Sequence, residues 1–599
     1  MSIISKICFP ASPELTNLYF KLEDGCTILS YEKSTIILGM NKKVSLNTYF
    51  NSIYENYIVK YTSIKDLRYE LFLEGAFRVF LYRQQKFQNP VLIRVLDFLD
   101  CLPSSSSYIS FHLEAEISQQ GRIYLEILSL NHESKLYGGM LSASQEKQTE
   151  VSLSIVICTY KKENYVKSTV RKLLENKNLN TKYYEIIVVD NAKTLALEDF
   201  PKDNRIHLLP SRNVGGSGGF TRGILEALSF SNTTHILLMD DDVSIDENTI
   251  YSLISFYEFS ISPACIAGAM LDLNRPCTLY EAGAKYATRL EYETILMPDI
   301  MQTAPIRHKL LLSDPTELNL LMDEAEFDYG GFWFFSFPKE LIIEVGLPLP
   351  FFIKVDDMEY SLRIRKQSKM NLLQLPQISV WHEPFYLKRV IWDLYYYTRN
   401  MLICNAIHYN YSSWITLLQL TKRFIGKVFI FDYNAALMVL KGLEDYLKGE
   451  VVLNSKNTED DHLSIIQQSK SFKHEVKLDD FIKCAGSGDV KLTDIIISLL
   501  TINGHFLPNF MLYKEDGYLM ANIPHPWLKA CRKKSIIEYH KHLGFFRREI
   551  SREIGINLCF RWFLLILRAF FQWRNITKSW RQAKATLSST RFWKEYLSS

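Results

Sequence analysis

Three nearly continuous apolar segments, residues 153–158, 185–189 and 235–239, most constrain the fold of this chain. Each has the length and composition of a strand that is buried on both faces, and helical sequence separates them. Buried strands that alternate with helices predict a doubly wound α/β sheet. Ligands of such sheets bind beyond the carboxyl ends of the strands, so the residues that follow each segment are the first candidates for a site.

Polar residues follow each of the three apolar segments. Because the carboxyl ends of parallel strands meet at one edge of a sheet, we expect these residues to converge on one cleft. The clusters are Thr159 with Lys162, Asp190 with Asn191, and the triplet Asp240, Asp241 and Asp242.

The aspartate triplet places three like charges in a row, which is costly unless a cation is shared. Alternation at the end of a strand points Asp240 and Asp242 to the same side, so their carboxylates can meet one hard metal ion. Asp241 then faces elsewhere. A solvated turn or a helix cap is the alternative, and Ser244 with Glu247 forms a capping-box pattern for the next helix. Because that pattern leaves the triplet unexplained, we predict a metal-bound sugar-diphosphate site.

The glycine-rich segment 211–222, which contains Asn213, Gly215 and Gly216, opens a predicted helix that continues through Ala227. Bare backbone amides there can approach an anionic or sugar ligand, and a helix N-terminus favours negative charge. A flexible turn without a ligand is the alternative. No Gly-Lys-Ser/Thr follows, so the segment is not a P-loop, and it also lacks the dinucleotide-binding pattern.

The sequence on either side predicts two further domains. Residues 109–127 alternate between apolar and polar around Gln119-Gln120-Gly121, which predicts a β-hairpin, and a similar pattern begins at Phe77. From about residue 411 the patterns are helical, and the polar stretch 454–471 is interpreted as a loop. We therefore expect an N-terminal β-sandwich-like domain at 1–145, an α/β domain at 151–410 and a C-terminal helical domain at 411–599 with a basic, aromatic tail.

Composition favours a folded protein and excludes several classes. Of the 599 residues 47% are hydrophobic and 23% charged, and the ten cysteines include no Cys-x-x-Cys pair. This indicates reduced thiols in the cytoplasm, and we expect no nucleic-acid partner. The N-terminus is a poor signal peptide, and no run of about 18 uncharged apolar residues predicts a membrane span.

The tail from Arg532 onward is basic. It holds 15 Lys or Arg against 4 Glu, a net charge of +11, whereas the whole chain carries +3. Arginines interleave with Trp and Phe between residues 545 and 596. This mixture suits a helix that lies on an anionic membrane surface, and a helix packed on the enzyme body is the alternative.

Six motifs, taken together and in order, resemble the polymerizing galactofuranosyltransferases of glycosyltransferase family 2. The resemblance covers about residues 151–410. The motifs occupy residues 213–223, 239–242, 328–333, 352–357, 381–382 and 399–400.

The resemblance implies a GT-A fold and an inverting, metal-dependent transfer of galactofuranose from UDP-galactofuranose, with Mn²⁺ or Mg²⁺. The implied acceptor is a lipid-linked or oligosaccharide chain of a bacterial surface glycan, such as O-antigen, capsule or cell-wall galactan. The enzyme would be cytoplasmic and peripheral on the inner face of the cell membrane, with a homo-oligomer left open. Carried over by motif, the metal ligands are Asp240, Asp242 and His382, the donor-binding residues are Thr159, Lys162, Asp190, Asn191, Asn213, Gly215, Gly216 and Asp241, the catalytic base is Asp357, and the acceptor-binding residues are Trp333 and Asp356.

Several of these residues have a structural alternative. Asp356 with Glu359 is also a capping-box pattern, although a carboxylate at a helix start is well fixed to act as a base. Trp333 lies in an aromatic run that is typical of a core, although indole also stacks well on the C–H faces of sugars. A lone histidine such as His382 is more often structural than a ligand.

The chain departs from the family pattern at three positions, where Val355 and Phe332 replace tryptophans and Lys162 replaces an arginine. Lys162 brings charge to a diphosphate without the bidentate fork of arginine. The changes at Val355 and Phe332, near the acceptor, affect the expected linkage and polymerisation more than the expected identity of the donor. Three alternatives stay open: a family 2 transferase with a rhamnose or pyranose donor, a non-catalytic glycan-binding scaffold, and a nucleotidylyltransferase, whose Gly-rich, Lys-containing signature is missing after the first strand.

Overall fold

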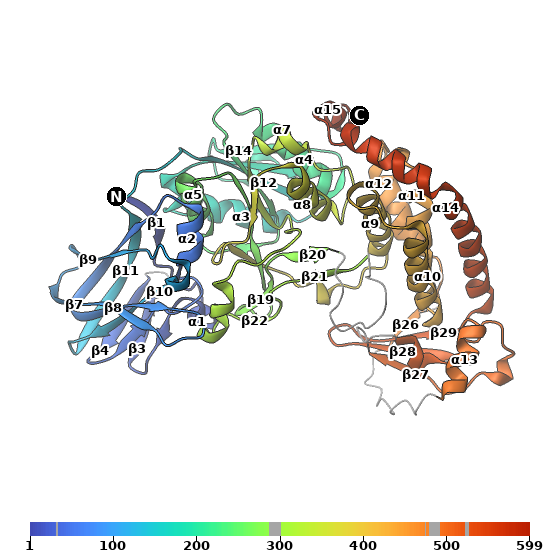
Figure 1. Ribbon diagram of the computed structural model, residues 1–599, viewed down its shortest axis with the longest axis horizontal. Helices are drawn as coiled ribbons and strands as arrows, with labels where there is room; N and C mark the ends of the chain where they lie inside the picture. Colours follow the sequence, from blue (N-terminus) through green and yellow to red (C-terminus); the bar gives the residue numbers. More distant parts are fainter. Residues whose placement is uncertain (31–33, 287–300, 474, 479–490, 521–525, 599) are drawn as a thin grey trace.

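The computed structural model describes residues 1–599 except 31–33, 287–300, 474, 479–490, 521–525 and 599. Figure 1 shows an arched molecule in which N-terminal strands occupy one end, a mixed α/β region lies in the middle, and long helices form the other end. The apolar segments of the sequence form buried strands in the middle region, as predicted.

Eleven strands among the described residues form the N-terminal part. Their order is β2-β5-β10-β7-β11-β4-β3, with β1 on β11, β6 on β10, and both β8 and β9 on β7. The long strand β7 belongs to two sheets, because its first half pairs with β9 and β11 and its second half with β8 and β10. The strands are β1 (Ser2–Lys6), β2 (Lys21–Leu22), β3 (Cys26–Ser30), β4 (Thr35–Gly39), β5 (Lys43–Ser45), β6 (Ile53–Tyr54), β7 (Asp66–Gln84), β8 (Val91–Cys101), β9 (Ser106–His112), β10 (Arg122–Ser129) and β11 (Glu133–Ala143).

The hairpin predicted for residues 109–127 is wrong. Both strands form, as β9 and β10, but each pairs with β7 and not with the other. A short 3-10 helix at Ile117–Gln119 lies between them. The alternation correctly identified one buried face on each strand, but it carries no information on which strand lies alongside.

The predicted α/β sheet is confirmed in the middle region. Its order is β14-β13-β12-β15-β23-β17-β24, and β12, β13, β14 and β15 run parallel. Helix α4 (Gly215–Ala227) packs on β12 and β13. The strands are β12 (Ser152–Thr159), β13 (Tyr183–Asp190), β14 (Ile206–Pro210), β15 (His235–Asp240), β17 (Ala264–Ala267), β23 (Phe334–Pro338) and β24 (Asn371–Leu373), and the other helices here are α3 (Glu163–Glu175), α5 (Thr249–Phe259), α7 (Leu341–Val345) and α8 (Asp356–Gln367).

A second sheet extends the middle region on the side of the aspartate triplet. Its order is β16-β25-β18-β19-β22, and β25 runs parallel to β18. This pairing places His382, at the end of β25, opposite Asp272. The strands are β16 (Ser244–Ile245), β18 (Ala269–Asp272), β19 (Thr278–Glu281), β22 (Leu310–Leu311) and β25 (Ser379–His382).

The C-terminal part is largely helical, as predicted, but it also contains a four-stranded sheet that the sequence analysis did not foresee. The sheet order is β26-β29-β28-β27. The stretch 454–471, predicted as a loop, contains helix α12, because its polar residues lie on an exposed surface helix. The helices are α9 (Asp393–His408), α10 (Ser413–Phe429), α11 (Tyr433–Tyr446), α12 (Thr458–Gln468), α13 (Leu492–Leu500), α14 (Arg552–Leu587) and α15 (Thr590–Ser598), and the strands are β26 (Glu475–Leu478), β27 (Gly517–Met520), β28 (Ser535–His540) and β29 (Gly544–Glu549).

Helix α14 spans 36 residues and contains an 18-residue window of mean hydropathy 1.7, of which 28% is buried. Within the described part of the chain it is the one helix whose length and composition would allow it to cross a membrane, which is weak evidence for a span. Its buried residues, among them Trp562, Ala569 and Trp580, pack on α9, α10 and α11. Beyond it, α15 returns to α4, where the indole of Trp593 donates a hydrogen bond to the Pro348 carbonyl.

Candidate active site

The register of the parallel strands brings the three predicted polar clusters to one edge of the sheet. Thr159 lies opposite Asp190 across β12 and β13, and Cys158 lies opposite Asp240 across β12 and β15. These residues end their strands on the same side, as expected for a doubly wound sheet. The convergence predicted from the sequence is therefore present.

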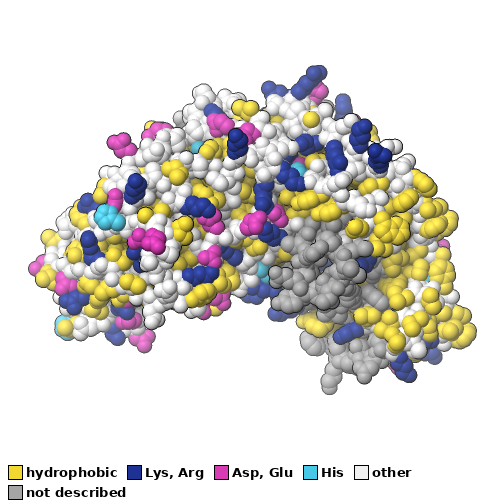
Figure 2. All heavy atoms as spheres, in the orientation of Figure 1, with side chains coloured by type: hydrophobic (Ala, Val, Ile, Leu, Met, Phe, Trp, Pro, Cys, Tyr) yellow, Lys and Arg dark blue, Asp and Glu magenta, His cyan; other side chains and the backbone are white. Residues whose placement is uncertain are grey.

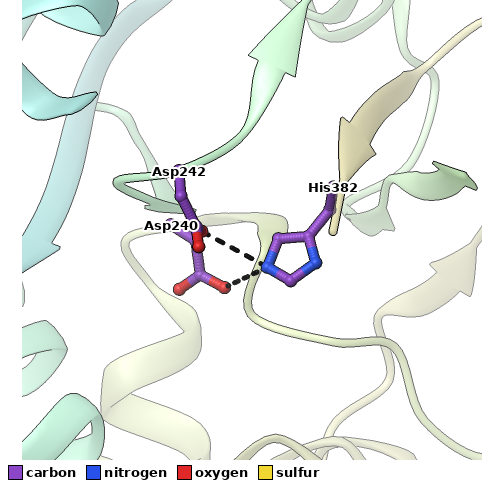
Figure 3. A group of neighbouring side chains, drawn as sticks. All are labelled: Asp240, Asp242 and His382. Atoms are coloured by element: carbon purple, nitrogen blue, oxygen red, sulfur yellow. Dashed lines mark ion pairs between the residues drawn. The ribbon is translucent and has the colours of Figure 1, made fainter. Parts of the chain in front are cut away.

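Asp240, Asp242 and His382 form a group that could hold a metal ion (Figure 3). One ligand atom of each residue lies within 4.8 Å of the others. The His382 Nε2 is 3.3 Å from an Asp242 oxygen and 3.8 Å from an Asp240 oxygen. Two carboxylates and one imidazole suit a divalent cation such as Mn²⁺.

The hydrogen bonds of His382 prepare its Nε2 for a metal. The Nδ1 lies 2.8 Å from the Glu383 carbonyl oxygen, so it carries a proton, and Nε2 can offer its lone pair to a metal once it loses its own proton. Burial opposes protonation of His382, but the carboxylates of Asp242 and Asp240 outweigh it and raise the pKa. Burial likewise raises the pKa of Asp240, against the influence of His382. A divalent cation bound between these groups would compensate the negative charge of the two carboxylates.

Asp241 faces away from the metal group, as the strand alternation predicts. Its carboxylate accepts a hydrogen bond of 2.7 Å from the Thr159 hydroxyl, and burial raises its pKa to about 6 although Lys162 opposes this. The Lys162 ammonium lies 2.6 Å from Asp242 and 3.4 Å from Asp241. Lys162 therefore partly neutralises the triplet and leaves a cation beside the metal group.

The capping box predicted from Ser244 and Glu247 is wrong. Ser244 begins strand β16, which pairs with β25, and α5 begins only at Thr249 after Asn248. Pairing with the strand that carries His382 outweighs the local helix-start pattern. The residues after the triplet therefore help to place the histidine.

The glycines of the segment 211–222 lie within helix α4, and most of them serve close packing. A Cβ on Gly219 would come within 2.1 Å of the Cys158 sulfur, and Gly215 has φ +71° with the Phe352 carbonyl oxygen 2.0 Å from its Cβ position. Gly216 has no neighbour within 4 Å of its Cβ position. Of the glycines proposed to contact a donor, Gly216 alone faces open space.

Asn213 and Asn191 lie beside the start of α4. The Asn213 side chain accepts a hydrogen bond from the Gly215 amide, and Asn191 donates one to the Gly215 carbonyl. The Asn191 Oδ1 is buried without a partner among the described residues. The carboxylate of Asp190 accepts hydrogen bonds from three backbone amides of the following loop, which ends at Leu195. Asn191 thus has an unused acceptor, whereas Asp190 mainly fixes the loop.

Gly215→Ala is expected to destabilise the fold by about 2–4 kcal/mol, because the new methyl group meets the Phe352 carbonyl and the backbone is left-handed. Gly216→Ala is the matched control, since nothing lies near its Cβ position. Chemical denaturation of both variants measures the difference. Equal unfolding free energies of the two variants would contradict this prediction, because they would mean that the Phe352 carbonyl moves aside without a measurable loss of stability.

The carboxylates of Asp356 and Asp357 begin helix α8, but the capping box predicted for Asp356 is wrong. Val355 is the N-cap, and Asp356 is the first helical residue. Glu359 instead forms a buried ion pair with Arg363, 2.7 Å apart, and approaches His408 at 2.9 Å. Burial and the charge of Asp357 raise the pKa of Asp356, and burial raises the pKa of Asp357. Asp356 is thus not the N-cap, whereas the Asp357 carboxylate accepts a hydrogen bond of 2.8 Å from the Met358 amide in the first turn of α8.

The loop before this carboxylate pair is strained. Phe352, Lys354 and Val355 have φ angles of 70°, 67° and 70°, and this left-handed conformation is especially unfavourable for the β-branched Val355. The side-chain amide of Asn400 donates to the carbonyls of Ile353 and Lys354 at 3.0 and 2.9 Å. Its neighbour Arg399 donates to the Phe351 carbonyl at 2.9 Å. The Arg399-Asn400 motif therefore holds the loop that positions Asp357.

Asn400→Ala should lower kcat roughly 10- to 100-fold, because the loop that carries Asp357 loses its fixed geometry. Asn400 lies on α9 and is a positioning residue, so binding of UDP with a metal should change little. Steady-state kinetics and calorimetry of UDP binding separate the two effects. A variant that folds normally and keeps the wild-type kcat would contradict this role.

Glu281, at the end of β19, was missed in the sequence analysis. It is 7% exposed, and its Oε1 has no hydrogen-bond partner among the described residues. Burial and the nearby charge of Asp357 raise its pKa to about 8, so the carboxyl group is mainly neutral at pH 7. One pattern in the sequence could have indicated Glu281, which is the carboxylate that ends the alternating segment 278–281 just before Gly283. A neutral carboxyl group beside Asp357 can donate a hydrogen bond to a substrate hydroxyl.

The structure buries Trp333 more than its predicted acceptor role suggests. Its side chain belongs to the core and is 7% exposed, and its indole donates to the Gly268 carbonyl at 2.9 Å. Phe385 lies 6.2 Å from the Trp333 ring, measured between centroids, and is 41% exposed. Phe385, and not Trp333, is therefore the exposed aromatic ring of this pair.

Comparisons with known proteins agree with this geometry. The family described as "Glycosyltransferase like family 2" matches residues 151–388, which contain the triplet and His382. The match assigns these residues to a glycosyltransferase domain on an α/β fold, and the protein is a glycosyltransferase.

Two similar proteins are mycobacterial enzymes. The chain is 24% identical to galactofuranosyltransferase GlfT2 of Mycobacterium tuberculosis over 467 residues, which cover 75% of this chain and 72% of that one. It is also 24% identical to galactofuranosyltransferase GlfT2 of Mycolicibacterium smegmatis over 429 residues, which cover 70% of this chain and 66% of that one. The resemblance to galactofuranosyltransferases inferred from the motifs is confirmed.

Two solved structures also match. S. aureus TarS has 12% identity and a TM-score of 0.29, with 56% of this chain and 98% of that chain covered. The mannosyltransferase PcManGT from Pyrobaculum calidifontis, solved with GDP-Man and Mn²⁺, has 11% identity and a TM-score of 0.27, with coverage of 55% and 84%.

Proposed function

We propose that the protein transfers galactofuranose from UDP-galactofuranose to a growing bacterial surface glycan, with inversion and with a bound Mn²⁺ or Mg²⁺. The observation that carries this proposal is the proximity of two separate groups at the carboxyl edge of the sheet. Asp240, Asp242 and His382 form a metal group, and the half-buried pair Asp356 and Asp357 lies near enough to raise the pKa of Asp240. The galactofuranosyltransferase relatives support the choice of sugar.

The two groups divide the work of the reaction. A metal held by Asp240, Asp242 and His382 supplies Lewis-acid stabilisation of the departing diphosphate. Lys162 adds positive charge beside it. The nucleotide sugar is held by Asn191, Asn213, Thr159, Asp241 and the amides at Gly215 and Gly216, while Asp190 fixes the loop next to Asn191. Asp357 takes the proton of the acceptor hydroxyl, and an inverting displacement needs such a base on the face opposite the leaving group.

The acceptor side uses the other residues of the cleft. Asp356 and the neutral carboxyl group of Glu281 orient the acceptor hydroxyl toward Asp357, and Trp333 backs the aromatic surface on which the acceptor sugar stacks. Keeping Glu281 neutral avoids a further negative charge beside Asp357. We also propose that residues 1–145, 151–410 and 411–599 are the three domains.

A donor panel tests this function. The purified protein is incubated with Mn²⁺ and labelled UDP-galactofuranose, UDP-galactopyranose or dTDP-rhamnose, each with an oligosaccharide acceptor. Transfer from UDP-galactofuranose alone is the expected result. Efficient transfer from another donor would favour the runner-up, a family 2 transferase with a different nucleotide sugar, and binding of glycan without transfer would favour a scaffold.

We further propose that α14 lies on the anionic inner face of the cell membrane. One side of the helix exposes large apolar residues at helical spacing, and Arg561, Arg568 and Arg574 are also exposed. Figure 2 shows hydrophobic side chains gathered along the edge of the molecule formed by α14 and α13. The exposed apolar residues of α14 are Ile556, Phe560, Phe563, Leu564, Leu567, Phe570 and Phe571. Apolar rings with flanking cations are typical of interfacial helices.

Phe560→Ser combined with Phe571→Ser should weaken binding to anionic vesicles by roughly tenfold or more, because two exposed rings no longer insert. The two rings are 61% and 79% exposed, so the fold should tolerate the change. Ile117→Ser is the control, since Ile117 is 81% exposed in the N-terminal part. Flotation with phosphatidylglycerol vesicles measures binding. Equal flotation of the double variant and the control would contradict the proposal.

A further inference from the structure

A chain of aromatic rings leads from the metal group to the C-terminal sheet. Phe385 follows His382 closely, with ring centroids 6.0 Å apart, and Tyr280 lies 6.0 Å from Phe385. Tyr386 lies 6.2 Å from Tyr280, and His542 lies 4.7 Å from Tyr386. The rings come from β19, from the turn after β25, and from the turn between β28 and β29, so segments far apart in sequence build one track.

The rings of this aromatic track are accessible and fixed. Phe385 is 41% exposed, Tyr280 and Tyr386 are half-buried, and His542 is exposed. The Tyr386 hydroxyl donates a hydrogen bond of 2.8 Å to Asp272, which is fully buried next to His382 in the sheet. A core cluster would hide such rings, whereas these rings stay at least partly exposed and the hydroxyl of Tyr386 is held by Asp272.

The far end of the track is held against the catalytic region by buried charges. Arg389, three residues after Tyr386, forms two hydrogen bonds of 2.7 Å with Glu475 of β26. Glu475 also accepts a hydrogen bond from Arg548 of β29, whose side chain is fully buried. These ion pairs fix the position of the β28–β29 turn relative to Tyr386. The four-stranded sheet therefore completes the track and is not a loosely attached addition.

We infer that this aromatic track binds the acceptor glycan over several sugar residues behind the one that receives the new sugar. Sugars present apolar C–H faces that stack on aromatic rings, and successive rings can therefore hold successive residues. The track begins at Phe385, beside His382 and Trp333, and ends at the turn between β28 and β29. This inference rests on the proposed function and deepens it, because it makes the substrate a chain and assigns the C-terminal sheet a part in binding it.

Calorimetry of the full-length protein without any donor tests the track. The probes are octyl glycosides of β-linked galactofuranose with two, four and six residues. Wild-type affinity is expected to rise roughly tenfold or more from two to six residues, since each added stacking contact contributes a factor of about three or more. His542→Ala and Tyr386→Ala should each lower the ratio of six-residue to two-residue affinity by roughly threefold or more.

Two matched variants separate stacking from folding. Tyr386→Phe keeps the ring but loses the bond to Asp272, and it should keep the wild-type ratio. Tyr183→Ala removes a tyrosine that is 70% exposed on β13 and should change nothing. Equal wild-type affinity for all three lengths, no binding of any of them, or a ratio unchanged in both alanine variants would overturn the inference. Transfer of another sugar in the donor panel would overturn the proposed donor. It would not change the ratio of glycan affinities, because calorimetry measures that ratio without a donor.

Discussion

Asp242→Asn is expected to lower kcat of sugar transfer by about three orders of magnitude and to abolish its dependence on Mn²⁺. The change removes one carboxylate from the group formed with Asp240 and His382, 3.3 Å from the His382 Nε2. Stabilisation of a departing diphosphate by a metal amounts to several kcal/mol, which corresponds to about a thousandfold in rate. Asparagine has nearly the same shape, so the fold should persist. Initial rates with and without added metal measure the effect.

A second aspartate supplies the control for Asp242. Asp97 also forms an ion pair with a cation, Arg78 at 2.7 Å, but it lies on β8 in the N-terminal part. Asp97→Asn should leave the rate and the metal requirement unchanged. If Asp242→Asn kept its metal requirement and most of its rate, the metal group would have to lie elsewhere.

Asp357→Asn is expected to lower kcat by about 10²- to 10⁴-fold, since general-base catalysis contributes rates of this order. Asp357 lies on α8, outside the metal group, so the binding of UDP with Mn²⁺ should stay normal. Rate measurements combined with calorimetry of UDP binding separate the two groups. Loss of UDP binding in Asp357→Asn would contradict the division of labour proposed for the cleft.

The pH dependence of kcat gives a further test of Asp357. Burial raises its pKa above the ordinary value for an aspartate. The base must be deprotonated, so kcat should rise with pH through this raised pKa and then level off. Asp357→Asn should lose this acid limb, because the titrating group is gone. An acid limb that persists unchanged in the variant would assign the titration to another residue.

Much of the site could be predicted because its elements are local in sequence. The strands that end at Thr159, Asp190 and Asp240 are visible in the sequence as apolar runs. Strand alternation alone predicted that Asp241 faces away from the side on which Asp240 and Asp242 lie. The position of His382 came from its resemblance to a family motif. Its approach to the triplet depends on the pairing of β25 with β16 and β18, which no local pattern reveals.

The failures share one physical cause, which is that tertiary pairing outweighed local patterns. Ser244 resembled a helix cap but joined a strand, and the strands β9 and β10 resembled a hairpin but both paired with β7. The role of Asn400 became visible only through its bonds to the carbonyls of a left-handed loop. In the same way, the contact of Tyr386 with His542 joins the turn after β25 to the turn between β28 and β29.

The anomeric configuration of the product tests the central claim most directly. The protein is incubated with Mn²⁺, UDP-α-galactofuranose and an oligosaccharide acceptor, and NMR of the purified product gives the configuration of the new linkage. We predict a β-linked galactofuranose, with UDP released in equal amount and no product after chelation by EDTA. An α-linked product, or transfer that continues without metal, would contradict the account of a metal group and a separate base.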